Sequence, residues 1–312
     1  MRVFAKALRQ PFLELEFMAS GVSVEVIERP GLWMAPDRLQ ALSADLRRIA
    51  SLTLAAGELT YGVFSGDPAR MAASTITLVR DPQTRRPIGF NALVHLQTQP
   101  GNQRVEVIHL GLVMVDPNVQ SKGLSWILYG LTCMLLFLRA GLRPCYISNV
   151  TQVPAVVGMV SETFSEVVPT PQTPVPQDFR KILIAREIMA HHRHVFGVGA
   201  EAEFDDSDFI IRNAYTGGSD DLKKSFEIAP KHREARYNEW CKAVLDYERG
   251  DDVLQIGLLD LSAAQRYVSR SVPRRSLAGL ALLGLILVLQ RAIVPALQWF
   301  NPSRDFGRLQ SR

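Results

Sequence analysis

Cysteine is scarce in this 312-residue chain, and its three cysteines, Cys133, Cys145 and Cys241, lie far apart. None of them has the C-x-x-C spacing of a zinc or redox site, so neither a disulfide framework nor a zinc site is expected. Long basic runs are absent as well, since no block of Lys or Arg exceeds two residues and the net charge is only +4. We therefore expect reduced thiols, a cytoplasmic protein and no nucleic-acid partner.

The first twenty residues lack the uninterrupted apolar run of a secretion signal, because Glu14 and Glu16 interrupt it. Hydrophobic residues make up 47% of the chain and charged residues 21%, so a packed core is expected rather than disorder. The length suffices for one large domain or two modest ones.

Hydrophobic periodicity up to residue 149 predicts a definite order of elements. Strands are expected at 23–27, 74–80, 88–96, 105–115 and 144–149, and helices at 36–56 and 124–138. This order predicts an α+β fold with a mixed, mostly antiparallel sheet flanked by helices.

The stretch from Val107 to Leu128 carries the most informative pattern. Its first nine residues are almost all apolar and end at Asp116-Pro117, which predicts a buried strand and a turn. The loop Gln120-Ser121-Lys122-Gly123-Leu124-Ser125 follows, and an apolar helix begins there. Free first-turn amides and the positive end of the helix dipole make such a loop an anion site.

This stretch resembles motif A of the GCN5-related N-acetyltransferase (GNAT) superfamily, which reads Gln/Arg-x-x-Gly-x-Gly/Ala at the start of the helix after the fourth strand. Gln120 and Gly123 match it, and Ser125 replaces the last small residue. The resemblance covers roughly residues 20 to 170, and the expected order of elements agrees with it. The alternative is an ordinary strand–turn–helix corner in another α/β protein.

The resemblance implies acetyl-CoA or a longer acyl-CoA as co-substrate and an unknown amine as acceptor. In the family, the fourth and fifth strands splay apart and the pantetheine arm pairs in the gap like an extra strand. The implied pyrophosphate contacts are the amides of Gln120, Ser121, Lys122, Gly123, Leu124 and Ser125. The implied pantetheine contacts are backbone groups of Val113, Met114 and Val115.

His109 is the first candidate for the catalytic base. In the histone-acetylating branch of the family, the base is a glutamate eleven residues before the motif's Gln, and that position is His109. An imidazole with an ordinary pKa of about 6.5 accepts a proton at neutral pH. The alternative is a histidine packed in the sheet with both nitrogens satisfied. Glu106 is the second candidate, and a regular strand turns it to the opposite face.

The family's usual acid, a tyrosine after the fifth strand, is absent because Met159 stands at its position. Tyr146, Ser148 and Asn149 are nearby polar side chains, and the sequence does not choose among them. Two hypotheses follow. One is an acyl-CoA-dependent N-acyltransferase, and the other is a catalytically weak or inactive module that binds acyl-CoA or acts in regulation.

The chain is expected to have three parts: the acyltransferase core at 1–170, an extension at 171–268 and a terminal helix at 269–312. We expect the extension to complete the sheet and shape the acceptor pocket, although an independent second domain is the alternative. His191 and His194 are three residues apart, but no Asp, Glu or Cys stands at a matching distance, so no metal is expected.

The terminal helix is predicted at 277–294, where the chain is apolar on all sides apart from Gln290 and Arg291. A helix of this length spans about 27 Å, close to the roughly 30 Å of a bilayer core. This predicts a lipid-bilayer anchor that holds the enzyme at the cytoplasmic face of a membrane, where acyl-CoA is supplied. The alternative is a buried or dimer-forming helix.

Overall fold

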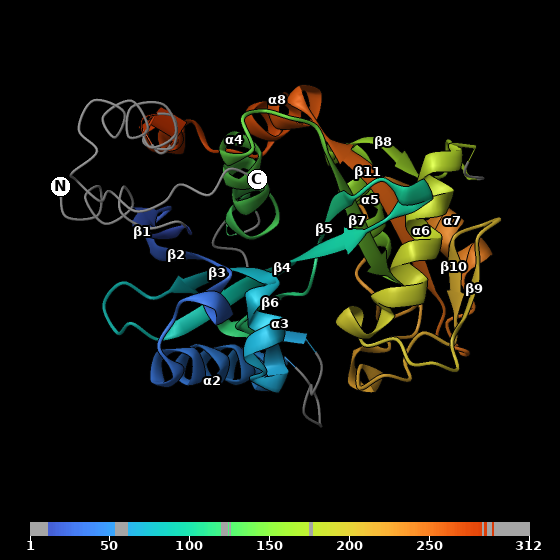
Figure 1. Ribbon diagram of the computed structural model, residues 1–312, viewed down its shortest axis with the longest axis horizontal. Helices are drawn as coiled ribbons and strands as arrows, with labels where there is room; N and C mark the ends of the chain where they lie inside the picture. The colour runs from blue at the N-terminus through green and yellow to red at the C-terminus, as the bar shows by residue number, and fades with distance from the viewer. Residues whose placement is uncertain are drawn as a thin grey trace.

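The computed structural model describes residues 12–53, 62–119, 124, 126–174, 177–282, 284, 285 and 289. Within these ranges, eleven strands form one sheet in the order β1-β2-β3-β4-β5-β7-β11-β10-β9, with β6 paired to β4 and β8 to β11. Neighbouring strands are antiparallel except for β5 and β7. The predicted mixed, mostly antiparallel sheet flanked by helices is confirmed (Figure 1).

The strands are β1 (Glu14–Ala19), β2 (Val22–Glu28), β3 (Ser74–Arg80), β4 (Pro87–Thr98), β5 (Val105–His109), β6 (Val113–Val115), β7 (Cys145–Thr151), β8 (Ser165–Val168), β9 (Glu203–Asp205), β10 (Ile210–Arg212) and β11 (Asp252–Leu259). The helices are α2 (Pro36–Thr53), α3 (Pro68–Ala72), α4 (Thr132–Arg139), α5 (Pro154–Thr163), α6 (Phe179–His191), α7 (Ala235–Val244) and α8 (Leu261–Arg270), with a π-helix η5 at Ile127–Leu131. Short 3₁₀ turns are η1 (Pro30–Leu32), η2 (Gly62–Ser65), η3 (Pro100–Asn102), η4 (Pro117–Val119), η6 (Arg193–Phe196), η7 (Asp220–Leu222) and η8 (Arg274–Ser276).

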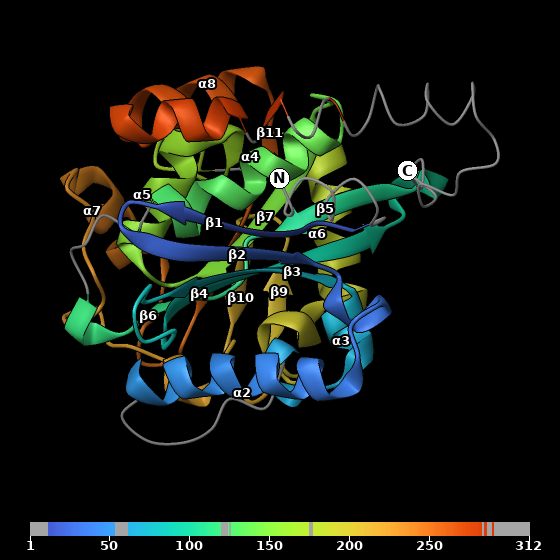
Figure 2. The same ribbon diagram turned by 90° about the vertical axis from the view of Figure 1, so that its left-hand side faces the viewer.

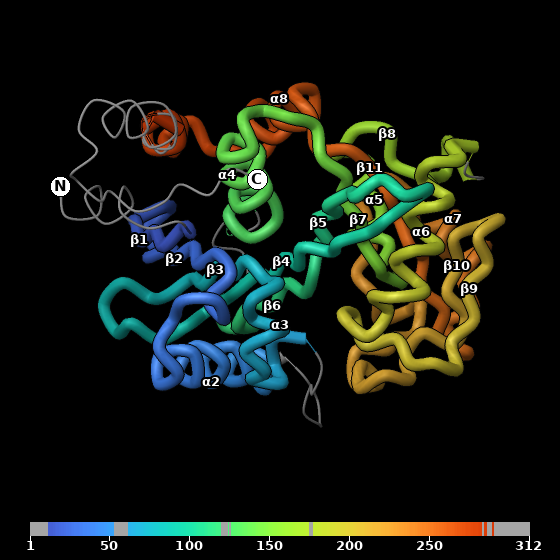
Figure 3. Tube along the Cα trace, viewed as in Figure 1, coloured from blue at the N-terminus to red at the C-terminus, as the bar shows by residue number. Residues whose placement is uncertain are grey.

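Helices cover both faces of the sheet, as Figure 2 shows for α2 on one side and α4 with α8 on the other. Leucines at helical spacing on α2, Leu39, Leu42 and Leu46, pack against the face of β4 that carries Phe90. The same face carries Val94, which packs with the apolar side of α6. The opposite face is buried beneath α4, α5 and α8. The elements α6, β9, β10 and α7 gather around β7 and β11, whereas α8 lies beside α4 (Figure 3).

Several elements differ from the sequence-based expectation. The strands β1, β8, β9 and β11 were not predicted. The strand β11 is the most consequential addition, because it is buried and lies between β7 and β10 within the sheet.

The predicted continuous strand 105–115 is wrong, because a β-bulge divides it into β5 and β6. Across β4, Val94 is opposite His109 and Asn91 is opposite Val113, so three residues of one strand face two of the other. Gly111 makes this possible, since a Cβ there would lie 1.9 Å from the Ala92 carbonyl oxygen. The Ala92 amide donates to the Leu112 carbonyl at 3.3 Å and fixes the bulge.

The predicted long helix begins as a π-helix and continues as α4. Gly130 in the π-helix leaves room for the ring of Tyr267 on α8, because a Cβ there would lie 2.1 Å from Tyr267 Cε2. The Tyr267 hydroxyl donates to the Trp126 carbonyl at 2.7 Å. The C-terminal part of the chain thus holds the start of this helix in place.

The predicted anchor helix lies largely outside the described residues, which stop being continuous at 282. The part that is described is helical from Leu277, and Leu282 and Leu285 are exposed. Among the described residues, no helix has both the length and the apolarity needed to cross a membrane.

Candidate functional site

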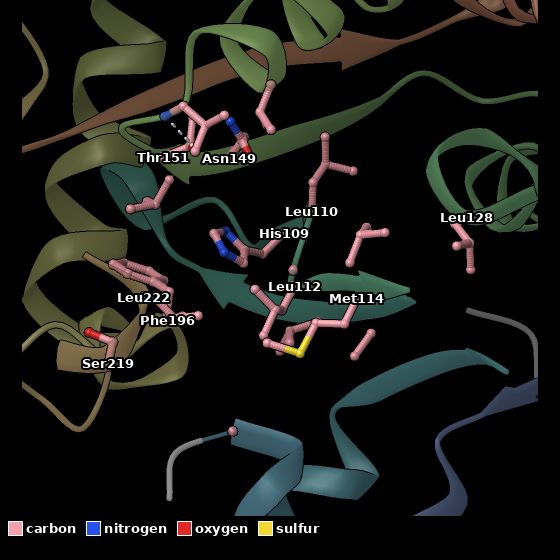
Figure 4. A pocket seen from close by; sticks show the side chains of 18 of the residues that line it. His109, Leu110, Leu112, Met114, Leu128, Asn149, Thr151, Phe196, Ser219 and Leu222 are labelled. Atoms are coloured by element: carbon pink, nitrogen blue, oxygen red, sulfur yellow. Dashed lines mark hydrogen bonds between the residues drawn. The ribbon is translucent and has the colours of Figure 1, made fainter. Parts of the chain in front are cut away.

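A cavity of about 780 Å³ opens where β6 and β7 part from each other. β5 and β7 pair in parallel from Val107 and Tyr146 to His109 and Ser148. Beyond His109 the bulge follows β4, whereas β7 continues beside β11, so the two strands no longer pair. Figure 4 shows side chains from the bulge, β7 and η6 around this space.

The bulge and β6 form one wall, because every residue from Leu110 to Val115 lines the cavity. The predicted pantetheine contacts Val113, Met114 and Val115 are therefore all on it. Val119 and Leu124, on either side of the predicted anion loop, also line the cavity. The loop residues Gln120, Ser121, Lys122, Gly123 and Ser125 lie outside the described residues, so their predicted role stays a prediction.

His109 lies inside the cavity between the bulge and Phe196 (Figure 4). The imidazole stacks on Phe196 at 5.0 Å between ring centroids, and Nδ1 is 3.0 Å from the Ser148 hydroxyl. No hydrogen bond joins Nε2 to any described residue. Burial, together with the nearby His192, lowers the pKa of His109 to about 3. The ring is therefore neutral at neutral pH and is a weak base.

Glu106 lies away from the cavity, on the face of β5 opposite to His109, as a regular strand requires. Its Oε1 is 2.7 Å from His95 Nδ1 and accepts a hydrogen bond from Arg29 Nη2 at 3.0 Å. His95 Nε2 in turn is 2.8 Å from the Thr75 hydroxyl. The carboxylate thus belongs to a polar network that ties β3, β4 and β5 together.

Of the three polar side chains expected on β7, Asn149 lines the cavity, Tyr146 does not, and Ser148 contacts the ring of His109. Asn149 is buried, and its Nδ2 donates to Gln255 Oε1 at 3.4 Å. The Tyr146 ring instead lies 5.7 Å from the Arg180 guanidinium, and burial raises the pKa of its hydroxyl. The cavity therefore brings His109 and Asn149 together and leaves Glu106 and Tyr146 outside.

A second polar group at the cavity was missed from the sequence. Asp252, at the start of β11, is 6% exposed and lines the cavity together with Tyr215 and Lys224. The Tyr215 hydroxyl donates to Asp252 Oδ1 at 2.9 Å. Burial raises the pKa of Asp252 to about 7, with a hydrogen bond from Tyr215 opposing the rise and the charge of Asp251 adding to it.

Gln152 joins this group from the end of β7. With its amide oriented to satisfy its neighbours, Oε1 accepts from the Lys224 amide at 2.7 Å and lies 2.9 Å from the Tyr215 hydroxyl. The sequence does carry a signal for the group. The pair Asp251-Asp252 stands directly before the apolar run 253–259, which places carboxylates at the mouth of a buried strand.

Asp251 has a structural role, unlike its neighbour. It accepts hydrogen bonds from the Asp246 and Asn213 amides and from the Arg249 guanidinium. Metal binding finds no support in the described part of the chain, where no group of three or more His, Cys, Asp or Glu side chains could hold an ion.

No protein-family model and no curated protein matches the chain by sequence. Among solved structures, the chain is similar to a ribosomal-protein-S5-alanine acetyltransferase from Vibrio fischeri at 10% identity. The similarity covers 78% of this chain and 96% of that one, with a TM-score of 0.34.

Proposed function

We propose that this protein is an acyl-CoA-dependent N-acyltransferase that transfers an acetyl or longer acyl group to an amine. The cavity beside the bulge is the observation that carries the proposal. A bulge next to the parallel β5–β7 pair opens the strand gap that the GNAT resemblance implies for an acyl carrier. In this proposal the pantetheine arm lies along Val113–Val115, and amides of Gln120–Ser125 hold the pyrophosphate.

His109 is proposed to act on the thioester carbonyl. If Nδ1 donates to Ser148, Nε2 is a proton acceptor; if Ser148 donates to Nδ1, Nε2 carries the proton and is a donor. The low pKa of His109 makes it a weak base that takes up little of an ammonium proton, so we assign it the second arrangement as part of the proposal. A donor at Nε2 stabilises the oxyanion that develops on the thioester oxygen.

Binding of the carrier is tested by thermal unfolding with coenzyme A, acetyl-CoA, octanoyl-CoA and palmitoyl-CoA. Ligands that bind only the folded protein raise its unfolding temperature, and we expect at least one acyl-CoA to do so. Val113→Arg fills the gap beside β6 and should abolish the shift. Val244→Arg is the matched control, because this valine is 38% exposed on α7 and does not line the cavity. No stabilisation by any of the four ligands overturns the proposal.

The alternative is a module that binds acyl-CoA without efficient turnover. Its support is the methionine at the family's acid position, since Met159 is partly buried against the core and has no proton to give. Release of free thiol from octanoyl-CoA, with and without hexylamine, separates the two. Amine-dependent release supports the transferase, and binding without release supports the module.

Attachment to a membrane is a separate proposal for the segment 277–294. The exposed leucines 282 and 285 and the apolar sequence that follows support it. Fractionation of the full chain and of a chain ending at residue 269 tests it. We expect only the full chain to sediment with membranes, and a full chain that stays in the supernatant contradicts the proposal.

A further inference from the structure

We propose that Asp252 binds the ammonium group of the acceptor amine and takes its proton. This inference rests on the proposed acyltransferase function for the transfer step, whereas the binding of an ammonium group can be measured without it. It assigns the acceptor end of the cavity to the group formed by Asp252, Tyr215 and Gln152.

The position of Asp252 separates it from the carrier side of the cavity. Asp252 precedes Val253, which pairs with Thr151, so it lies near the end of β7, three to four residues beyond Ser148. That corresponds to roughly 10 Å along the strand from the level of His109. Of the described residues that line the cavity, Asp252 is the one carboxylate. A cationic acceptor therefore has a single anionic partner at this end.

The hydrogen bonds of Asp252 leave part of its carboxylate unused. Oδ1 accepts from the Tyr215 hydroxyl, whereas Oδ2 has no hydrogen-bond partner among the described residues. The residue is 6% exposed and lines the cavity, and Oδ2 is not among the fully buried atoms that lack a partner, so this oxygen is open to a group in the cavity. An ammonium group arriving in the cavity supplies the missing donor.

The charges around Asp252 favour the same ligand. Asp251, its neighbour on β11, adds negative charge, and Tyr247 lies close enough for Asp252 to raise the pKa of its hydroxyl. Lys224 also lines the cavity, but no ion pair within 4.0 Å joins it to Asp252 among the described residues. A cation placed against Asp252 gains attraction and restores its ionised form.

The transfer step then balances as follows. The ammonium gives one proton to Asp252, and the free amine attacks the thioester carbonyl carbon. The new C–N bond forms, the C–S bond breaks, and the second nitrogen proton goes to the departing sulfur, which leaves as the thiol of coenzyme A. Asp252 then releases its proton to solvent. A carboxyl with a pKa close to neutral suits this role, since it takes the proton and returns it.

Binding of hexylamine, compared with hexanol, tests the first part by calorimetry at pH 8. The two probes have the same apolar body and differ in charge. We expect the unsubstituted protein to bind hexylamine at least tenfold more tightly than hexanol, and Asp252→Asn to lose this preference. Asp220→Asn is the matched control, because this aspartate is exposed on η7 and outside the cavity lining. Equal binding of the two probes, no binding of hexylamine, or an unchanged preference in Asp252→Asn overturns the inference.

Turnover tests the second part with octanoyl-CoA and hexylamine. Asp252→Asn should lower amine-dependent thiol release at least a hundredfold and remove its fall at acidic pH, while octanoyl-CoA still stabilises the variant. Tyr215→Phe should keep release but shift the pH profile, since it removes the hydrogen bond that stabilises the ionised carboxylate. Normal release by Asp252→Asn overturns the role as proton acceptor. If octanoyl-CoA does not bind but hexylamine binding depends on Asp252, the proposed function fails and the ammonium site stands.

Discussion

The buried carboxylate of Asp252 makes stability depend on pH, and the dependence can be measured without any substrate. Its pKa is about 7 in the folded protein and 3.8 in an unperturbed chain. Between these values the folded protein keeps a proton that the unfolded chain has released. The contribution of Asp252 to stability is therefore full below pH 3.8 and is lost as the pH rises through 7.

The size of the effect follows from the shift itself. One pKa unit corresponds to about 1.36 kcal/mol, so ionisation of Asp252 in the unfolded chain costs roughly 2 kcal/mol of stability at pH 5 and roughly 4 kcal/mol at pH 8. Asp252→Asn cannot ionise and escapes this cost. Relative to the unsubstituted protein, the variant should gain roughly 2 to 3 kcal/mol in free energy of unfolding between pH 5 and pH 8.

Urea unfolding at pH 5 and pH 8 measures this difference, and fluorescence and circular dichroism should give coincident transitions. Other titrating groups are common to both proteins and cancel in the comparison. A constant offset between the two proteins reflects the altered hydrogen bond with Tyr215 and is not the quantity of interest. If the offset is the same at both pH values, Asp252 ionises normally and the reasoning is refuted.

Three further predictions concern the frame of the cavity. Gly111→Ala places a methyl group against a backbone oxygen and should lower the free energy of unfolding by about 2 to 4 kcal/mol. Gly279→Ala is the control, because a Cβ there meets no atom within 4 Å. Equal urea midpoints for the two variants would contradict this prediction. Glu106→Gln should lower the free energy of unfolding by about 1 to 3 kcal/mol, because it weakens the contact with His95. Acyl-CoA should still raise the unfolding temperature of this variant, and loss of that rise would place Glu106 in the site instead. Tyr267→Phe should lower the free energy of unfolding by about 1 kcal/mol and speed hydrogen exchange at the start of the π-helix. Unchanged exchange would show that α8 does not stabilise the start of this helix.

Local sequence pattern predicted β2, β3 and β4 well. Ser74–Arg80 is a β-branched run bounded by turn residues, and it forms β3 with the same bounds. The bulge could not be predicted in the same way, because residues 110–115 are all apolar and periodicity contains no sign of an extra residue. What creates it is the approach of Gly111 to β4, a contact between segments that only the folded chain brings together.

The candidate site shows the same limit. His109 was found because a motif fixed its distance from Gln120, and the cavity does contain it. Asp252 was passed over because no motif includes it and β11 was not expected. Its chemistry depends on burial and on Tyr215, which lies 37 residues away in the sequence. The sequence can indicate which residues carry chemistry. Tertiary packing decides which of them lie in the same cavity and how far burial shifts their pKa values.

The position of β11 has a consequence for how the protein is made. This strand comes far after β7 in the sequence, yet it lies between β7 and β10 in the sheet and carries Asp252 into the cavity. During synthesis, β7 has no neighbour on that side until residues 252–259 have left the ribosome. The acceptor side of the cavity is thus completed only after residues 252–259 have been made, and until then β7 has an exposed edge that other chains can pair with. We expect the binding of chaperones during synthesis to depend on how long β7 remains without β11.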